Sequence, residues 1–245
     1  MRNPAKTLLG ALALLVVAAV IWRQYQTPER VAFSGAVRER VVALRVLAEY
    51  LSSRDAGGKV LVVANPFARQ PGQGTDVYAF EDAALRGLRQ GLKGTWHLVG
   101  VAHPELLPAA AKDPTSIPLP PDLTTPLSFM TSAGAWDALL RAHPVTDVWV
   151  SLIGLPVNAT AMAFWREERP RLALLLPDFR VLGGARVVQD AFASGKIVAA
   201  VLHRPGAGTA PAARAQKDGD IFDHRFLLVT RTNIAAVVSA WPELF

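Results

Sequence analysis

One unbroken apolar run limits what this chain can fold into. Residues 57–67 are Gly-Gly-Lys-Val-Leu-Val-Val-Ala-Asn-Pro-Phe, so five apolar residues stand between a glycine pair and an Asn-Pro pair. An apolar run without alternation, rich in β-branched residues, predicts a strand buried on both faces. Such strands are typical of the middle of a parallel sheet that helices cover.

Further runs of the same kind follow along the chain, and stretches with helical periodicity separate them. We therefore predict an α/β fold with a mainly parallel, five- to six-stranded sheet and helices on both faces. The expected strand order is 2-1-3-4-5, with the sixth strand at an edge. The predicted strands are 59–64, 96–102, 147–154, 172–176, 197–202 and 226–230. The predicted helices are 34–53, 77–92, 132–143, 159–168, 185–194 and one that Asn233 caps.

The N-terminus carries a second apolar segment, which predicts a transmembrane helix ahead of the α/β domain. Residues 7–22 are 16 residues without a charge, whereas a spanning helix needs about 20. Lysine and arginine at the two ends can extend to the lipid headgroups, and a tryptophan suits the interface. The predicted membrane-anchor residues are Lys6, Leu8, Leu15, Trp22 and Arg23.

Two alternatives to an uncleaved anchor are a cleaved signal peptide and a buried core helix. The sole Ala-x-Ala sequence of the segment, at residues 11–13, lies inside the apolar core, where a signal peptidase does not cut. Arg2 and Lys6 favour an N-terminus in the cytoplasm, although Arg23 and Arg30 weigh against it. The expected location is the bacterial cytoplasmic membrane, with a single pass and a periplasmic C-terminal domain.

Composition excludes several other classes. The chain is 51% hydrophobic and 19% charged, so it can build a core, and it has no cysteine for disulfides, thiolate chemistry or cysteine-based metal sites. The net charge of +6 falls to +3 when the three basic residues of segment 1–25 are left aside. No block of basic residues occurs, so nucleic acid is not an expected partner.

We expect an anchor at 1–25, a polar stalk and covering helix at 26–56, and the α/β domain at 57–245. Within that domain, segment 104–126 holds seven prolines in 23 residues, a density that disfavours regular helix and central strand. This Pro-rich arm either docks a partner or wraps on its own domain. Segment 205–220, rich in Gly, Ala and Pro, is predicted to be a mobile loop.

A ligand site is predicted where the parallel strands end, because ligands of open α/β sheets collect beyond the carboxyl ends of the strands. The polar residues that this rule places there can all form hydrogen bonds, and histidine with aspartate can exchange protons. The other interpretation of the same residues is that they end strands and form turns. The predicted ligand-binding residues are Asn65, His103, Asn158, Asp178 and His203.

Other site signatures are weak or missing. The acidic cluster 218–224 lacks the calcium-loop pattern and is interpreted as a solvated turn. No nucleophile elbow, Walker loop or dinucleotide-binding glycine motif occurs. The sequence therefore predicts no catalytic residue, no metal site and no cofactor.

The strand pattern, from residues 59–66 through 147–151 to 197–200, resembles one lobe of a type 1 periplasmic substrate-binding protein. The resemblance covers about residues 57–205 and consists of pattern, without signature residues. In that family two lobes clamp a ligand, whereas this chain has length for one full lobe. The resemblance implies fold more than function.

Three hypotheses follow. The first is a non-enzymatic, membrane-anchored accessory or scaffolding subunit of a membrane complex, with the lipid bilayer and other subunits as partners. The alternative is a membrane-tethered module that binds a small-molecule ligand through the strand-end residues. The third is an enzyme with an unrecognised site, which a close approach of Asp178 and His203 would favour.

Overall fold

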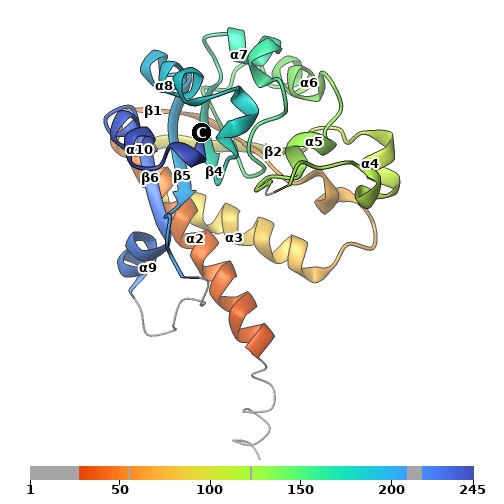
Figure 1. The fold of residues 1–245 in the computed structure, drawn as a ribbon, viewed down its shortest axis with the longest axis horizontal. Helices are drawn as coiled ribbons and strands as arrows, with labels where there is room; N and C mark the ends of the chain where they lie inside the picture. The colour runs from red at the N-terminus through yellow and green to blue at the C-terminus, as the bar shows by residue number, and fades with distance from the viewer. Residues whose placement is uncertain (1–27, 55, 122, 209–216) are drawn as a thin grey trace, which may run out of the picture.

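Six strands form one sheet at the centre of the protein (Figure 1). The computed structural model describes residues 28–54, 56–121, 123–208 and 217–245. The strand order is β2-β1-β3-β4-β5-β6, and all neighbours are parallel except the antiparallel pair β5–β6. The predicted order, with the sixth strand at an edge, is confirmed. The strands are β1 (Gly57–Val63), β2 (Thr95–Ala102), β3 (Val148–Ser151), β4 (Arg171–Leu175), β5 (Ile197–His203) and β6 (Phe226–Thr230).

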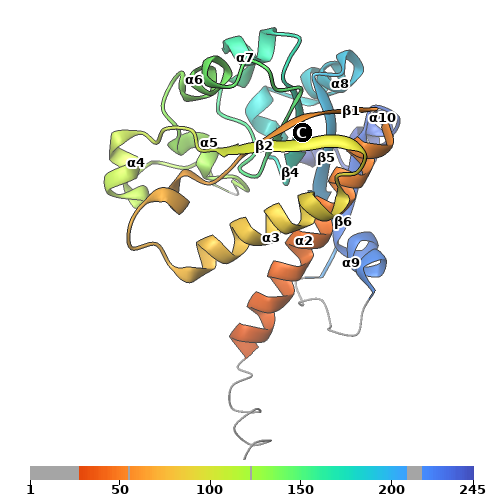
Figure 2. The same cartoon turned by 180° about the vertical axis from the view of Figure 1, so that it is seen from behind.

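Helices cover both faces of the sheet, as predicted. In Figures 1 and 2, α2 and α3 lie below the sheet, and α6, α7 and α8 lie above it. The first face is covered by α2 (Pro28–Arg54), α3 (Thr75–Gly91) and α9 (Asp218–Arg225). The second face is covered by α6 (Ala135–Ala142), α7 (Ala163–Arg166), α8 (Ala185–Ser194) and α10 (Ile234–Ala240).

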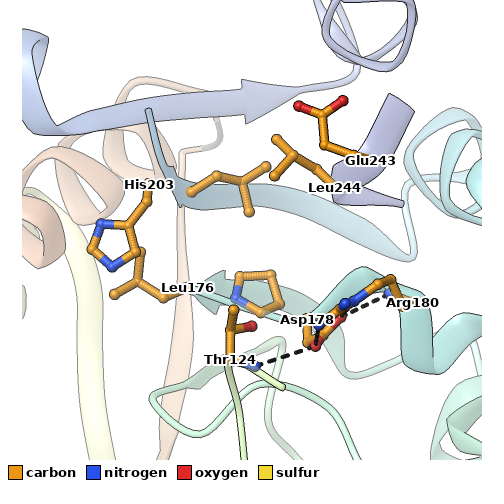
Figure 3. A pocket seen from close by; sticks show the side chains of 9 residues that line it. Thr124, Leu176, Asp178, Arg180, His203, Glu243 and Leu244 are labelled. Carbon is orange, nitrogen blue, oxygen red and sulfur yellow. Dashed lines mark hydrogen bonds and ion pairs between the residues drawn. The ribbon is translucent and has the colours of Figure 1, made fainter. Parts of the chain in front are cut away.

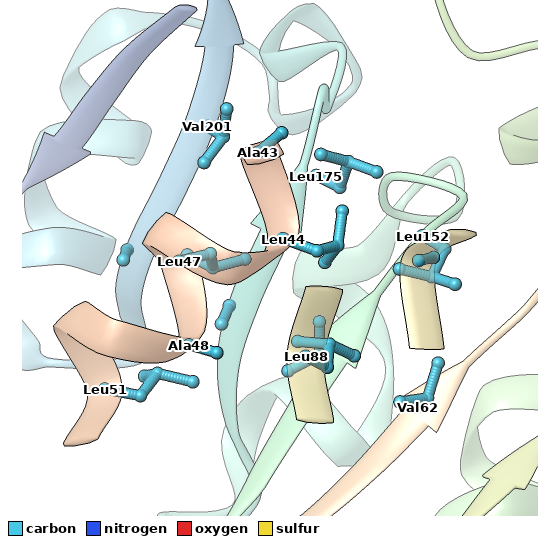
Figure 4. Packing of buried hydrophobic residues seen from close by; sticks show 14 of the residues in the cluster. Ala43, Leu44, Leu47, Ala48, Leu51, Val62, Leu88, Leu152, Leu175 and Val201 are labelled. Carbon is cyan, nitrogen blue, oxygen red and sulfur yellow. The ribbon is translucent and has the colours of Figure 1, made fainter. Parts of the chain in front are cut away.

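The strands can be apolar without alternation because each of their faces enters a different core. Val60 and Val62 pack with α2 and α3, whereas Leu61 and Val63 pack on the opposite side, and all four side chains are fully buried. Figure 4 shows the first core, in which Leu44 and Leu47 of α2 point toward the strands. Residues 60–63 of β1 are all apolar because their alternate side chains face two different cores.

Two glycines allow α2 and α3 to cross at very short range. A β-carbon at Gly87 would lie 2.4 Å from the carbonyl oxygen of Val41, and one at Gly91 would lie 2.3 Å from that of Arg45. Both obstructing atoms belong to the α2 backbone, so a side chain at either glycine requires the helices to separate. This crossing holds the longest helix against the sheet.

The Pro-rich arm folds onto its own domain. It contains two short helical segments that the proline density did not predict, α4 (Pro108–Lys112) and η2 (Pro114–Ser116), and α5 (Leu127–Met130) follows it. Leu106 and Ala110 of the arm bury against Phe67 and Met130 in a small separate core. Proline fits at the start of α4 because the first helical position needs no N–H partner.

Two local predictions were wrong. The first described helix begins at Pro28, so residues 28–33 are helical rather than a stalk, and the Ser34 hydroxyl donates to the Val31 carbonyl at 2.9 Å within the helix. Residues 218–220 begin α9 instead of ending a loop. Asn233 occupies the N-cap position of α10, as predicted, although its side chain accepts from the Thr230 N–H at 2.7 Å and makes no capping hydrogen bond to that helix.

The predicted anchor residues Lys6, Leu8, Leu15, Trp22 and Arg23 lie outside the described residues. Among the helices of the described part of the chain, none combines the length and apolar character that crossing a membrane requires.

A buried lysine ties α7 to the sheet. The Nζ atom of Lys196 donates to the carbonyl oxygens of Phe164, Glu167 and Pro170 at 2.5, 2.9 and 2.7 Å. Burial lowers the pKa of Lys196 to about 8, and the nearby Glu167 carboxylate opposes this shift. Because all three carbonyls accept from the same Lys196 ammonium group, this side chain holds the segment between α7 and β4 in place.

Replacing Gly91 with alanine will lower the free energy of unfolding by about 1–3 kcal/mol, because the new methyl group overpacks the α2–α3 crossing. On an exposed helix surface the same change stabilises by about 1 kcal/mol. Urea denaturation measures the effect, with the exposed neighbour Gln90→Ala as control. An unchanged midpoint for Gly91→Ala would refute the close crossing.

Replacing Lys196 with methionine will lower the free energy of unfolding by at least about 2 kcal/mol, because buried carbonyls lose their donor. Since the folded pKa of about 8 lies below the ordinary 10.5, the unfolded chain binds more protons between these values. The contribution of Lys196 to stability therefore increases with pH across this window. Urea titrations at several pH values, with the exposed Lys59→Met as control, measure both effects.

Candidate functional site

A cavity of about 470 Å³ opens where β4 and β5 end. Its floor is apolar, and its polar groups come from four separate parts of the chain, including the Pro-rich arm and the C-terminus. Figure 3 shows His203 and Asp178 at different ends of this cavity. The lining residues are Thr124, Leu176, Pro177, Asp178, Arg180, Leu202, His203, Glu243 and Leu244.

The backbone turns sharply after β4 and directs Asp178 to the cavity. Leu176 has a φ of 47°, a left-handed conformation that is rare for a leucine, and its N–H still donates to the Val201 carbonyl at 2.8 Å. Pro177 then precedes Asp178, which caps the short helix η4 (Phe179–Leu182). The strand end and the cap together fix where this carboxylate lies.

Asp178 is buried and tied to Arg180. Its Oδ1 accepts from the Arg180 N–H at 3.1 Å and from Nε at 2.8 Å, while Oδ2 accepts from Nη2 at 2.6 Å and from the Thr124 N–H at 3.4 Å. Burial by itself raises the pKa of Asp178, but the hydrogen bonds from Arg180 and Thr124 outweigh it and hold the pKa below its usual value. The carboxylate therefore fixes the guanidinium, whose side chain is 43% exposed, at the cavity wall.

His203 ends β5 on the other side of the cavity. Its ring stacks on Phe226, with centroids 5.5 Å apart. Although the residue is exposed, desolvation by its surroundings lowers the pKa of His203; the Glu39 carboxylate opposes this effect and Arg225 reinforces it. At neutral pH the imidazole is therefore uncharged and can both donate and accept a hydrogen bond. No hydrogen bond joins it to Asp178 in the described structure.

The arm and the C-terminus complete the site, and the sequence did not identify either contribution. Thr124 comes from the Pro-rich arm, and Glu243 and Leu244 come from the last turn, η5 (Pro242–Leu244). The Phe245 ring stacks on Phe179 with centroids 5.5 Å apart and so holds the chain end over the strands. No local pattern marks these residues, because only the folded chain brings them beside Asp178. Arg180, two residues after Asp178, is the one lining group that the strand-end rule could have found.

Of the five predicted ligand residues, Asp178 and His203 share this cavity and the other three lie outside its lining. The Asn65 Oδ1 accepts from the Phe67 N–H at 3.0 Å and caps the short helix η1 (Pro66–Arg69). His103 is half-buried, and burial together with Arg69 lowers its pKa. Asn158 is exposed in a left-handed turn with a φ of 61°.

The acidic cluster is part of a helix rather than a solvated turn. Asp218 pairs with Arg38 and Arg45 of α2, each at 2.8 Å, and these hydrogen bonds lower the pKa of the Asp218 carboxyl. Within the described residues, no group of three or more His, Asp or Glu side chains is arranged to hold a metal ion.

A scan of protein-family models finds no match, and no curated protein matches this chain in sequence. Several solved structures match in fold. A carbohydrate transporter solute binding protein from Agrobacterium radiobacter, in complex with D-arabinose, is 16% identical with a TM-score of 0.47, covering 82% of this chain and 62% of its own. AraP, an arabinose binding protein from Geobacillus stearothermophilus, is 13% identical with a TM-score of 0.44, covering 81% and 62%.

The XylFII–LytSN complex gives a further match, with 10% identity, a TM-score of 0.47 and coverage of 79% and 60%. Periplasmic solute-binding proteins, which the strand pattern resembles, are among the matching structures. The chain spans about three fifths of the length of these structures.

Replacing Asp178 with asparagine will lower the free energy of unfolding at neutral pH by about 1–3 kcal/mol, because the Arg180 guanidinium loses its carboxylate. Since the folded pKa lies below the ordinary 3.8, the contribution of Asp178 is present above pH 3.8 and is lost as the pH falls through the folded value. The free energies of unfolding of the wild-type protein and of Asp178→Asn will therefore become equal in acid. The exposed Asp190→Asn serves as control, and a constant difference at all pH values would contradict the ion pair.

Proposed function

We propose that this protein is a small-solute-binding module whose site is the cavity at the ends of β4 and β5. The observation that supports this most directly is the convergence of Asp178, Arg180, His203 and Thr124 on a single apolar-floored cavity of about 470 Å³. A cavity of this size with a few convergent polar groups is the usual form of a small-molecule site.

The chemistry of the lining favours a solute that carries several hydroxyl groups. Arg180 supplies donors, Glu243 supplies acceptors, and the neutral His203 imidazole supplies both. Leu176, Leu202 and the other apolar residues of the floor offer a surface for the C–H groups of such a solute. A polyhydroxylated ring presents both kinds of surface, so it satisfies the polar rim and the apolar floor together.

The geometry favours binding over acid–base catalysis. The Asp178 oxygens already accept hydrogen bonds from Arg180 and Thr124. A carboxylate held this way orients a neighbouring guanidinium well, but its lowered pKa makes it a poor proton acceptor. His203 does not contact it. This separation weighs against the hypothesis of an enzyme built on these two residues.

Membrane attachment is part of the proposal. Residues 7–22 and the flanking Lys6 and Arg23 support an anchor in the cytoplasmic membrane with the domain on the periplasmic side. The accessory role in a membrane complex stays a hypothesis. The structure weakens one argument for it, which was that the Pro-rich arm is available to dock a partner. The Pro-rich arm, which was a candidate docking segment, buries Leu106 and Ala110 against its own domain.

A thermal-shift screen of neutral monosaccharides, polyols and amino acids will identify a stabilising solute. Saturation to about 100 times the Kd adds roughly 2.7 kcal/mol to the free energy of unfolding. The substitution His203→Gln, at an exposed strand end, will weaken or remove the shift while leaving the unliganded protein folded.

Asn158→Ala, an exposed residue outside the cavity, is the matched control and will retain the shift. A ligand whose effect survives His203→Gln but not Asn158→Ala would move the site away from this cavity. If no compound of the screen stabilises the protein, solute binding at this site is refuted.

A further inference from the structure

A second cavity adjoins the first at His203. It also measures about 470 Å³, and His203 lines both cavities, so the two meet at this side chain. Its walls come from the first turns of α2, including Ala36 and Glu39, and from the segment after β5, including Arg204. Arg225, from the end of α9, completes the polar part of the wall. The helix α2 forms one wall of this cavity through Ala32, Ala36 and Glu39.

The second cavity carries a cationic group without a counter-ion. Arg225 is paired with Glu39, at 3.2 Å between Nε and Oε1, and both side chains are largely buried. Arg204 is half-buried, and its side chain forms no hydrogen bond or ion pair with any described residue; its Nε is fully buried without an acceptor. A buried N–H donor without an acceptor is costly unless a ligand or ordered water supplies one.

The two longer segments outside the described residues carry no acidic side chain. Segment 209–216, which follows Gly208 at the cavity edge, contains no Asp or Glu, and neither does segment 1–27. Among the residues that the structure describes, the charged groups that line the cavity are Arg204, Arg225 and Glu39, and His203 is uncharged at neutral pH. Their sum is one positive charge, placed beside the site proposed for a hydroxylated solute.

We propose that the natural solute is an acidic sugar or polyol, with its hydroxylated part in the first cavity and its carboxylate or phosphate on Arg204 in the second. This inference rests on the proposed function and adds the chemical class of the solute. His203, at the junction, bridges the two parts as a neutral hydrogen-bonding group. A charge-assisted contact of the guanidinium then selects acidic over neutral ligands.

Isothermal titration of the full chain with matched pairs tests this proposal, using glucose against glucuronate and glucose 6-phosphate, and galactose against galacturonate. We expect at least one acidic member to bind about 10-fold or more tightly than its neutral partner. The preference will decrease as potassium chloride is added, because the selecting contact is ionic. The carboxylate and phosphate ligands distinguish the two kinds of anionic group.

Arg204→Gln will remove the preference for the acidic ligand and leave the affinity for the neutral partner unchanged. Arg231→Gln, an exposed arginine outside both cavities, is the matched control and will keep the preference. Should Arg204→Gln fail to fold, the wild-type comparison and its salt dependence still decide the question.

The outcomes separate the two proposals. Neutral and acidic ligands that bind equally, with no effect of Arg204→Gln, overturn the acidic-solute inference and leave solute binding intact. If no ligand of either class binds, both proposals fail. An acidic preference that survives Arg204→Gln but disappears in Arg231→Gln places the anion elsewhere and overturns the inference.

Discussion

The structure depends on covering a sheet whose central strands are apolar on both faces. Val62 and Leu61 are neighbours in sequence but belong to separate cores, so each face needs its own helices. On one face this requirement is met by the 27-residue helix α2, which the glycines of α3 allow to approach closely. If that crossing opened, the first core would be exposed to water, and the position of α2 relative to the strand ends would be lost.

The same constraint determines where a ligand can reach the protein. Helices occupy both faces, and the carboxyl ends of the parallel strands are where loops leave the layers. At β4 and β5 these loops do not close over the sheet, because the left-handed Leu176 turns the chain away and leaves a cavity beside His203. The arm and the C-terminal turn then add Thr124 and Glu243 to its rim.

Charge is arranged unevenly around this region. Asp178 neutralises Arg180 in the first cavity, and Glu39 neutralises Arg225 in the second. Arg204, in the second cavity, has no such carboxylate among the described residues. The first cavity also contains the Glu243 carboxylate beyond the Asp178–Arg180 pair, whereas the second has its excess cation in Arg204. The two ends therefore differ in charge, and a solute that spans them is recognised by that difference. The helix that covers the core, α2, is also the wall that separates this cationic end from solvent.

The sequence by itself determined the α/β class and the burial of the sheet on both faces, because an unbroken apolar run such as that in residues 57–67 is a local property of the chain. The alternation of such runs with helical segments also predicted the strand order. It also placed Asp178 and His203 at strand ends. Only the tertiary structure decided that these two share a cavity while Asn65 caps a helix, and that Thr124 and Arg204 belong beside them. Except for the Asn65 cap, those relations join residues far apart along the chain, and contacts of that kind arise from packing, which leaves no periodic trace in the sequence.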